Sequence, residues 1–227
     1  MIITIDGPTA SGKSSIAQLL AQSLHMNYLN SGMLYRVLAY LLLEKKYVLS
    51  EEMPQLTSDT LQTIAAENPF QYYYNSVSGQ ASIIYKEHDI TALLKTKKID
   101  HAASLLALNQ SVRDYLLAYQ RSYAIDNDVV VEGRDCGSIV FPAADVKFFL
   151  TAAVGKRASR WQNDQKKQGI DISFDDAIIQ VQDRDTRDSA RTIAPLIVPL
   201  GAIVLDNSAL NKQQTVERML EYIRNIK

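Results

Sequence analysis

Residues near the start of the chain carry the strongest chemical signal. The run Gly7-Pro8-Thr9-Ala10-Ser11-Gly12-Lys13-Ser14 fits the pattern of Gly, four free positions, Gly, Lys and Ser or Thr. Glycines let the backbone turn tightly, so that amide N–H groups can approach phosphate oxygens. Lysine can reach the terminal phosphates, and a serine hydroxyl can ligate Mg²⁺ between two of them. The run therefore predicts a nucleotide-phosphate site, with Lys13 as a catalytic cation and Ser14 as a metal ligand.

The flanks of this run fit a phosphate-binding P-loop. The β-branched residues 2–5 predict a buried strand in front of it, and Ile16, Leu19, Leu20 and Leu24 recur behind it at helical spacing. A Gly/Ser turn that only links a strand to a helix is the alternative, and the complete match in these flanks disfavours it. A P-loop does not name the chemistry, because kinases, GTPase switches, motors and some transferases share it.

The composition predicts an ordinary globular enzyme. The chain has 227 residues, is 47% hydrophobic and 22% charged, and carries a formal net charge of −1. A dedicated nucleic-acid binder would usually be basic. Cys136 is the one cysteine, which fits a reducing compartment. The start shows no secretory signal, and the longest apolar run, 37–43, is too short to span a bilayer. We expect a monomeric cytoplasmic protein that binds neither nucleic acid nor membrane.

Apolar runs predict the architecture. Five short strands, at 2–5, around Tyr28-Leu29, and at 129–131, 146–151 and 202–208, alternate with helices, which predicts an α/β fold with a five-stranded parallel sheet. Residues 44–69 indicate a linker and then a helix capped by Ser58 or Asp59. Residues 70–74 and 81–85 flank a turn-rich stretch and predict a β-hairpin. Asn211 is expected to cap the closing helix.

Two charged stretches follow these elements. Acidic and basic residues, Glu132, Arg134 and Asp135, stand at the end of the valine-rich strand, where open α/β sheets place ligands. Residues 183–195 carry several arginines and aspartates, which by themselves favour a solvated, self-neutralising helix. With a P-loop upstream, arginines on a mobile segment become candidates for closing over a transferred phosphoryl group.

Four blocks of residues resemble bacterial cytidylate kinases (CMP kinases). Asn30-Ser31-Gly32-Met33-Leu34-Tyr35-Arg36 is similar to the family's Asp-Ser-Gly-x-x-Tyr-Arg. Ala102-Ala103-Ser104 and Val112-Arg113 are similar to its Ala-Ala-Ser and Val-Arg. Residues 132–142 resemble Asp-Gly-Arg-Asp-x-Gly-x-x-x-Phe-Pro, and residues 184–191 resemble the Arg-Asp-x-Arg-Asp-x-x-Arg lid, which ends in Ala-Pro-Leu as here. The resemblance spans the whole chain in the family's order.

The resemblance implies transfer of a phosphoryl group from ATP, with Mg²⁺, to CMP or dCMP. It assigns ATP to Gly7, Pro8, Thr9, Ala10, Ser11, Gly12, Lys13, Ser14, Ser15 and Arg157. It assigns CMP to Ser31, Tyr35, Arg36, Ser104, Arg113, Arg134, Asp135, Asp188 and Arg191. Within this set the arginines at 36, 134 and 191 hold phosphate, Ser104, Arg113 and Asp135 face cytosine, and Asp188 faces ribose. Arg184 and Arg187 are expected to bridge the donor and acceptor phosphates, which makes Lys13, Arg134, Arg184, Arg187 and Arg191 the catalytic set.

The resemblance also implies a division of the chain and marks three departures. Residues 1–30, 126–152 and 196–227 would form the P-loop core, 31–125 a monophosphate-binding insertion and 153–195 a lid. Asn30 and Glu132 stand where the family usually has Asp, and Ser189 stands where many members have Arg. These departures could shift the acceptor preference, for example toward UMP.

Two other classes remain as alternatives. The P-loop run also resembles that of tRNA dimethylallyltransferases, but those chains are usually longer and bind a large polyanion, and the later blocks here match the kinase. A GTP-dependent switch would need the guanine-reading Asn-Lys-x-Asp, which the sequence lacks.

Overall fold

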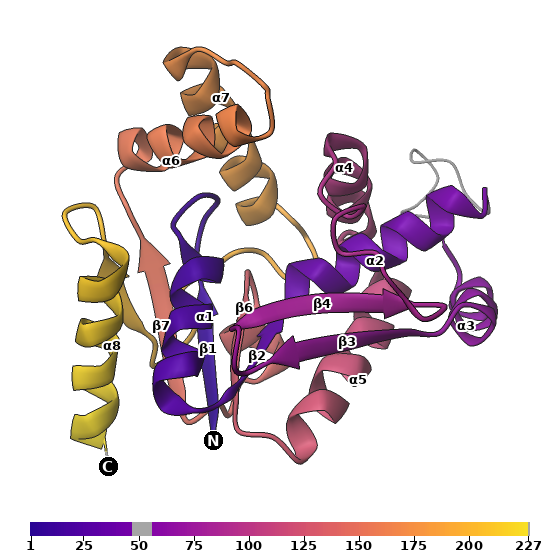
Figure 1. The fold of residues 1–227 in the computed structure, drawn as a ribbon, viewed down its shortest axis with the longest axis horizontal. Helices are drawn as coiled ribbons and strands as arrows, with labels where there is room; N and C mark the ends of the chain where they lie inside the picture. Colours follow the sequence, from indigo (N-terminus) through magenta and orange to yellow (C-terminus); the bar gives the residue numbers. More distant parts are fainter. Residues whose placement is uncertain (47–55, 227) are drawn as a thin grey trace.

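The computed structural model describes residues 1–46 and 56–226 and contains a five-stranded parallel sheet (Figure 1). The strand order is β2-β6-β1-β7-β8, and every neighbouring pair is parallel. The strands are Ile2–Asp6 (β1), Asn27–Asn30 (β2), Val129–Gly133 (β6), Val146–Thr151 (β7) and Ile203–Asp206 (β8). The predicted parallel sheet is therefore confirmed.

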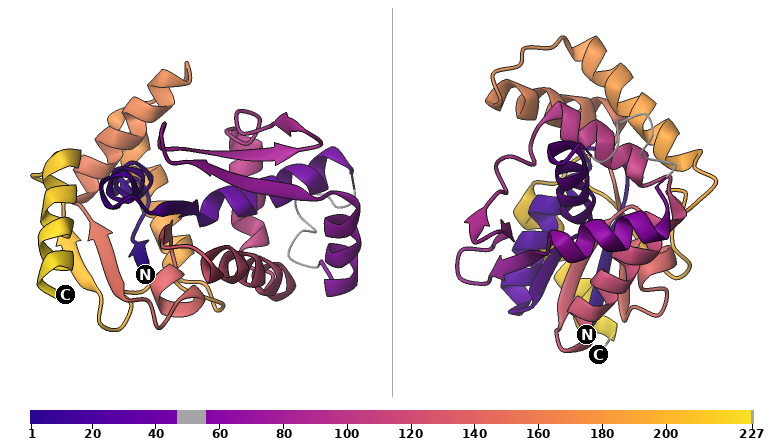
Figure 2. Two further views of the ribbon diagram at one scale, coloured as in Figure 1. Left: turned by 60° about the horizontal axis from the view of Figure 1, so that its bottom comes forward. Right: turned by 90° about the vertical axis from the view of Figure 1, so that its right-hand side faces the viewer.

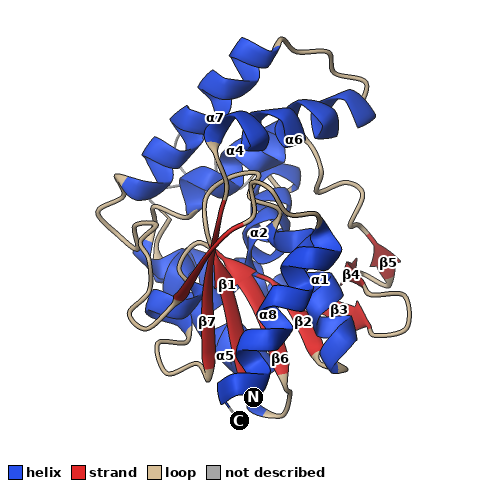
Figure 3. Cartoon of the chain, turned by 90° about the vertical axis from the view of Figure 1, so that its left-hand side faces the viewer, coloured by secondary structure: helices blue, strands red, loops and turns tan. Residues whose placement is uncertain are grey.

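The central strands form the core of the molecule. Ile3 and Ile5 of β1 and the three valines of β6 are all 0% exposed, which is expected where helices cover both faces of a sheet. Helix α1 (Lys13–Leu24) and helix α8 (Lys212–Ile226) pack against each other beside the sheet (Figure 3). Asn211 caps α8 as predicted, because its Oδ1 accepts a hydrogen bond from the amide of Gln214 at 2.9 Å.

A second group of elements follows β2. Its helices are α2 (Ser31–Glu44), α3 (Ser58–Glu67), α4 (Lys97–Leu106) and α5 (Gln110–Ile125). Its strands are β3 (Phe70–Asn75), β4 (Gln80–Tyr85) and β5 (His88–Asp89), which form a separate antiparallel sheet. Figure 2 shows this group extending to one side of the parallel sheet.

The sequence expectations for this group are partly corrected. The predicted hairpin is confirmed as β3 and β4, but β5 was missed because two residues are too short to show a period. The predicted cap of α3 is wrong: Thr57, and not Ser58 or Asp59, accepts from the amide of Thr60 with its side chain. Most of the expected linker, residues 47–55, lies outside the described residues.

Helices α6 (Val154–Lys167) and α7 (Phe174–Ser189) pack together above the P-loop end of the sheet (Figures 1 and 3). Ser173 begins α7 by accepting a hydrogen bond from the amide of Asp176. No helix among residues 1–46 and 56–226 is long and apolar enough to cross a membrane. The division into core, insertion and lid stays a prediction.

Candidate active site

The P-loop joins β1 to α1, and its backbone demands glycine at two positions. Gly7 has φ +150°, and a Cβ there would lie 2.1 Å from the carbonyl oxygen of Leu150 on β7. Gly12 has φ +95° and caps α1 in the left-handed region. The loop can therefore pass tightly over the sheet and turn the N-terminus of α1, with its positive dipole end, toward a bound anion.

Lys13 lies in the P-loop as a buried cation. Its Nζ donates to the carbonyl oxygen of Pro8 at 2.7 Å and to Ser11 Oγ at 3.3 Å. Burial, assisted by the positive charge of Arg134, lowers the pKa of Lys13 to about 7. A phosphate arriving beside this ammonium would restore the charge that burial disfavours, so Lys13 is poised for an anionic ligand.

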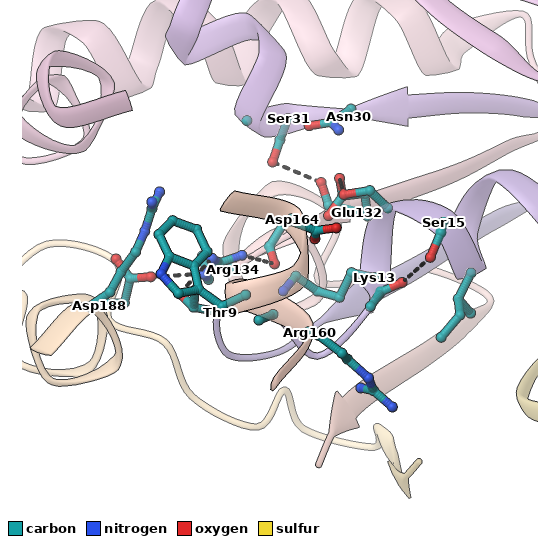
Figure 4. Close-up of a pocket in the computed structure, with 18 of the residues that line it drawn as sticks. Thr9, Lys13, Ser15, Asn30, Ser31, Glu132, Arg134, Arg160, Asp164 and Asp188 are labelled. Carbon is teal, nitrogen blue, oxygen red and sulfur yellow. Dashed lines mark hydrogen bonds and ion pairs between the residues drawn. The ribbon is translucent and has the colours of Figure 1, made fainter. Parts of the chain in front are cut away.

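The far side of the P-loop is held by residues that the sequence reasoning did not assign. Arg160 Nη1 and Asn207 Nδ2 both donate to the carbonyl oxygen of Ser11, at 3.1 and 3.0 Å. Arg160 Nη1 also donates to Asn207 Oδ1 at 3.0 Å. Figure 4 shows Arg160 below Lys13 in the view. Only the fold could reveal this, because Asn207 and Ser11 are 196 positions apart in the chain.

Glu132 and Asn30, two of the departures from the family pattern, lie in one polar cluster beside the P-loop. Ser14 Oγ donates to Glu132 Oε1 at 2.7 Å, and the Tyr28 hydroxyl donates to the same oxygen at 3.3 Å. Asn30 Nδ2 donates to the Tyr28 hydroxyl, while Asn30 Oδ1 caps α2 by accepting from the amide of Met33. Asn30 therefore keeps a capping role without a charge. Glu132 places a carboxylate against Ser14, the residue predicted to ligate the metal.

A cavity of about 790 Å³ opens from the P-loop toward α2, α4 and α7. Most predicted site residues line it: Thr9, Ala10, Gly12, Lys13, Ser14, Ser15, Ser31, Tyr35, Arg36, Ser104, Arg113, Arg134, Asp135, Arg184, Asp188 and Arg191. Gly7, Pro8, Ser11, Arg157 and Arg187 do not line it. Figure 4 shows Thr9, Arg134 and Asp188 drawn together on one side of the cavity, with Ser31 and Asn30 across from them.

Near the start of α5 the cavity is lined by a buried ion pair. Arg113 of α5 pairs with Asp135, the second residue after β6. Tyr35 lies close enough to this pair for their charges to act on it, although burial is the main reason why its pKa is raised. Ser31 Oγ donates to the carbonyl oxygen of Glu132 at 2.9 Å, which ties the start of α2 to the end of β6. This part of the cavity thus offers a carboxylate acceptor next to a guanidinium donor.

Asp188 lies between two arginines where α7 meets the core. Arg134 Nε donates to Asp188 Oδ2 at 2.8 Å, and Arg191 pairs with the other oxygen. Arg134 Nη2 also donates to Thr9 Oγ1 of the P-loop at 3.2 Å. Burial raises the pKa of Asp188, but the two arginines outweigh burial and the pKa is lowered. Asp188 is therefore ionised, and it orients Arg134 and Arg191 at the edge of the cavity.

A second carboxylate, Asp100 of α4, also holds two arginines. Arg36 of α2 and Arg184 of α7 both pair with it. All three residues line the cavity. The sequence reasoning assigned Arg36 and Arg184 but not Asp100, because the three residues meet only in the folded chain.

Two predicted residues lie outside the cavity for different reasons. Arg157 is buried behind the P-loop, where Nη1 donates to the Thr9 carbonyl oxygen at 3.0 Å and pairs with Asp185. Asp185 in turn accepts from the Thr9 amide at 2.9 Å. Arg157 of α6 and Asp185 of α7 therefore both bond to the P-loop backbone. Arg187 is exposed and does not line the cavity, whereas Arg184, Asp188 and Arg191 do. Both assignments stay predictions.

A parallel sheet with a P-loop after its first strand, and an arginine-lined cavity beside that loop, define a P-loop nucleotide-binding α/β protein. A sequence profile described as cytidylate kinase matches residues 3–225. The chain belongs to the cytidylate kinase family.

Individual relatives agree with this assignment. The chain is 35% identical to a cytidylate kinase from Colwellia psychrerythraea over 97% of this chain and 95% of the relative. It is also 35% identical to a cytidylate kinase from Shewanella frigidimarina over 98% and 94%. An uncharacterized protein from Eubacterium ventriosum has a similar structure, with a TM-score of 0.53 at 12% identity and coverage of 99% and 98%. That likeness concerns the fold alone.

Proposed function

We propose that this protein transfers the γ-phosphoryl group of ATP to CMP or dCMP, giving ADP and CDP or dCDP. The observation that carries the proposal is one cavity that is lined both by the P-loop and by the Arg113–Asp135 pair, in a chain of the cytidylate kinase family. A triphosphate at the P-loop and a nucleoside monophosphate at the Arg113–Asp135 pair would face each other across the arginines.

The donor end would hold the phosphates of ATP through the P-loop amides and Lys13. The local chemistry fits Mg²⁺, because Ser14 Oγ and a carboxylate oxygen of Glu132 lie 2.7 Å apart beside the P-loop and Mg²⁺ prefers oxygen ligands. When bound, Mg²⁺ supplies charge neutralisation on the phosphates. Arg157 supports this end from behind by fixing the carbonyl group of Thr9.

The acceptor end would hold CMP by charge and by hydrogen bonds. Arg36, Arg134 and Arg191 line the cavity and can bind the acceptor phosphate. Asp135 is suited to accept from the exocyclic amino group of cytosine, since N4 of that base is a donor. The remaining members of this set are Ser104 and Arg113 at the base, Asp188 at the ribose, and Ser31 and Tyr35 facing the nucleoside monophosphate.

The transfer itself would need no covalent intermediate with the protein. Catalysis would come from holding the donor and acceptor in line and from stabilising charge on the transferred group. Arg184 would take part from α7, and Arg187 would do so after turning from its exposed position. Closure of α6 and α7 would exclude water and limit hydrolysis of ATP. We further propose that the protein works as a monomer and that it works in the cytoplasm.

ADP release measured with ATP, Mg²⁺ and a single added acceptor tests the proposal. CMP, dCMP, UMP, AMP and dTMP are compared, and we expect strong turnover with CMP and dCMP alone. Turnover with another acceptor would keep phosphoryl transfer but overturn the assignment of Arg113 and Asp135 to cytosine. Absence of turnover with every acceptor would contradict the proposed function.

A further inference from the structure

Asp100 lies in the cavity without a role in the function proposed above. It belongs to the first turn of α4, which begins after Thr96 caps the helix. Its two partners come from distant parts of the chain: Arg36 is 64 positions away and Arg184 is 84 positions away. One carboxylate therefore joins α2 and α4 to α7 at the wall of the cavity.

The contacts fix the orientation of both guanidinium groups. Asp100 Oδ1 accepts from Arg36 Nε at 3.2 Å and from Arg36 Nη2 at 2.7 Å. Asp100 Oδ2 pairs with Arg184 Nη1, while Arg184 Nη2 is 3.5 Å from Oδ1. A guanidinium has five N–H donors, so an arginine that holds one carboxylate keeps donors for a second anion. Arg36 and Arg184 are therefore oriented so that one phosphate could accept hydrogen bonds from both.

The same carboxylate opposes an incoming phosphate by its charge. Burial raises the pKa of Asp100, but Arg36 and Arg184 outweigh it and bring the pKa to about 2, so the group is ionised at neutral pH. Like charges in one cavity repel each other. Asp100 therefore orients the arginines and at the same time disfavours phosphate binding.

The two arginines are not held equally. Arg36 uses Nε and Nη2 together, whereas Arg184 Nε is buried without a hydrogen-bond partner among the described residues. A buried donor without a partner is costly. Arg184 can therefore gain by turning toward a phosphate, whereas Arg36 is already held side-on.

We infer that Asp100 is a positioning residue for phosphoryl transfer: it sets Arg36 and Arg184 beside each other for the transferred group and weakens acceptor binding in return. The inference rests on the proposed function, because it takes the acceptor to be a nucleoside monophosphate. Removal of the charge should leave the acceptor bound at least as tightly while the reaction slows. Simple damage to the site would weaken binding as well.

The test compares Asp100→Asn with wild type and with Asp114→Asn, a matched loss of charge at an exposed position on α5. We expect Asp100→Asn to lower kcat about tenfold, with a KM for CMP no higher than that of wild type and a KM for ATP unchanged. Single-turnover rates are measured beside kcat, because slow product release would otherwise hide the chemical step. Asp100→Glu, which keeps the charge, should recover part of kcat.

A fall in the kcat of Asp100→Asn of less than threefold, or any rise in its KM for CMP, would overturn the inference. Turnover of CMP by wild type would at the same time support the proposed function. If wild type does not phosphorylate CMP, the proposed function fails, and calorimetric binding of CMP decides the inference instead. Binding of CMP to Asp100→Asn at least as tight as its binding to wild type would support the inference. Weaker binding, or no binding to either protein, would overturn it.

Discussion

The two carboxylates that each hold a pair of arginines differ in their surroundings. The Asp188 side chain is 3% exposed, with Arg134 at 22% and Arg191 at 9%. The Asp100 side chain is 25% exposed, with Arg36 at 31% and Arg184 at 22%. Charges that are removed from water depend strongly on their partners, whereas charges near water do not. The same arrangement of residues should therefore serve stability at Asp188 and orientation at Asp100.

The two clusters also connect different parts of the chain. Asp188 holds Arg134, which follows β6 and donates to the P-loop residue Thr9, so this cluster fixes the base of α7 to the core. Asp100 connects the outer helices α2 and α4 to an earlier turn of the same helix α7. Loss of the first cluster should therefore be felt in the fold and in catalysis, and loss of the second mainly in catalysis.

The largest effect is expected from removing an arginine of the buried cluster. Arg191→Ala should lower kcat about a thousandfold, the scale found for arginines that neutralise a transferred phosphoryl group, while the protein remains folded. CMP-dependent ADP release and thermal unfolding measure the two properties. Arg218→Ala, at an exposed position on α8, is the control. Turnover of Arg191→Ala near the wild-type rate would contradict a catalytic role for Arg191.

Removal of the buried carboxylate should be the largest effect on stability. Asp188→Ala leaves Arg134 and Arg191 without their common partner and should lower the free energy of unfolding by about 3 kcal/mol. Urea unfolding measures this difference, with Asp183→Ala at an exposed position of the same helix as the control. A loss no larger than that of the control would mean that the Asp188 cluster does not stabilise the fold.

The corresponding change in the open cluster should cost much less. Asp100→Ala should lower the free energy of unfolding by clearly less than Asp188→Ala does, because the ion pairs of Asp100 reach water. Added salt, at about 0.5 M, should reduce this small difference but leave that of Asp188→Ala nearly unchanged, since buried pairs are screened less. Equal costs for the two alanine variants would break the comparison between the clusters.

Local patterns were enough to predict much of the fold. The β-branched run before the P-loop predicts β1, and the three valines predict β6, because a strand buried on both faces needs continuous apolar residues. The two-residue strand β5 and the π-helix Cys136–Val140 were beyond such reasoning. The π-helix forms where the amides of Cys136 and Gly137 donate to the carboxylate of Asp6, 130 and 131 positions away.

The site could be predicted only where its residues follow one another in the chain. The P-loop and the residues around Arg134 are short continuous motifs, and they lie together in the structure. Asp100 and Asn207 act through partners far along the chain, so no local pattern marks them. The exposed position of Arg187 could not be predicted from spacing, because it stands three residues after Arg184 and four before Arg191.

The smallest expected effect is the pH dependence of the open cluster. The pKa of Asp100 in the folded protein is about 2, below the ordinary value of 3.8. A carboxyl group with a lowered pKa stabilises the fold fully above its ordinary pKa and loses this contribution as the pH falls toward the folded-state value. The difference in the free energy of unfolding between wild type and Asp100→Asn should thus be constant at neutral pH and shrink below about pH 4.

Unfolding by urea at about pH 7, 5 and 3 measures that difference. The pKa of Asp188 is lowered as well, so the difference between wild type and Asp188→Asn should shrink in the same direction. Acid therefore weakens both clusters, whereas salt should weaken only the one that water reaches. A difference for Asp100→Asn that grows toward low pH would mean that its carboxylate opposes folding, and the arginines would then be held together by the rest of the chain.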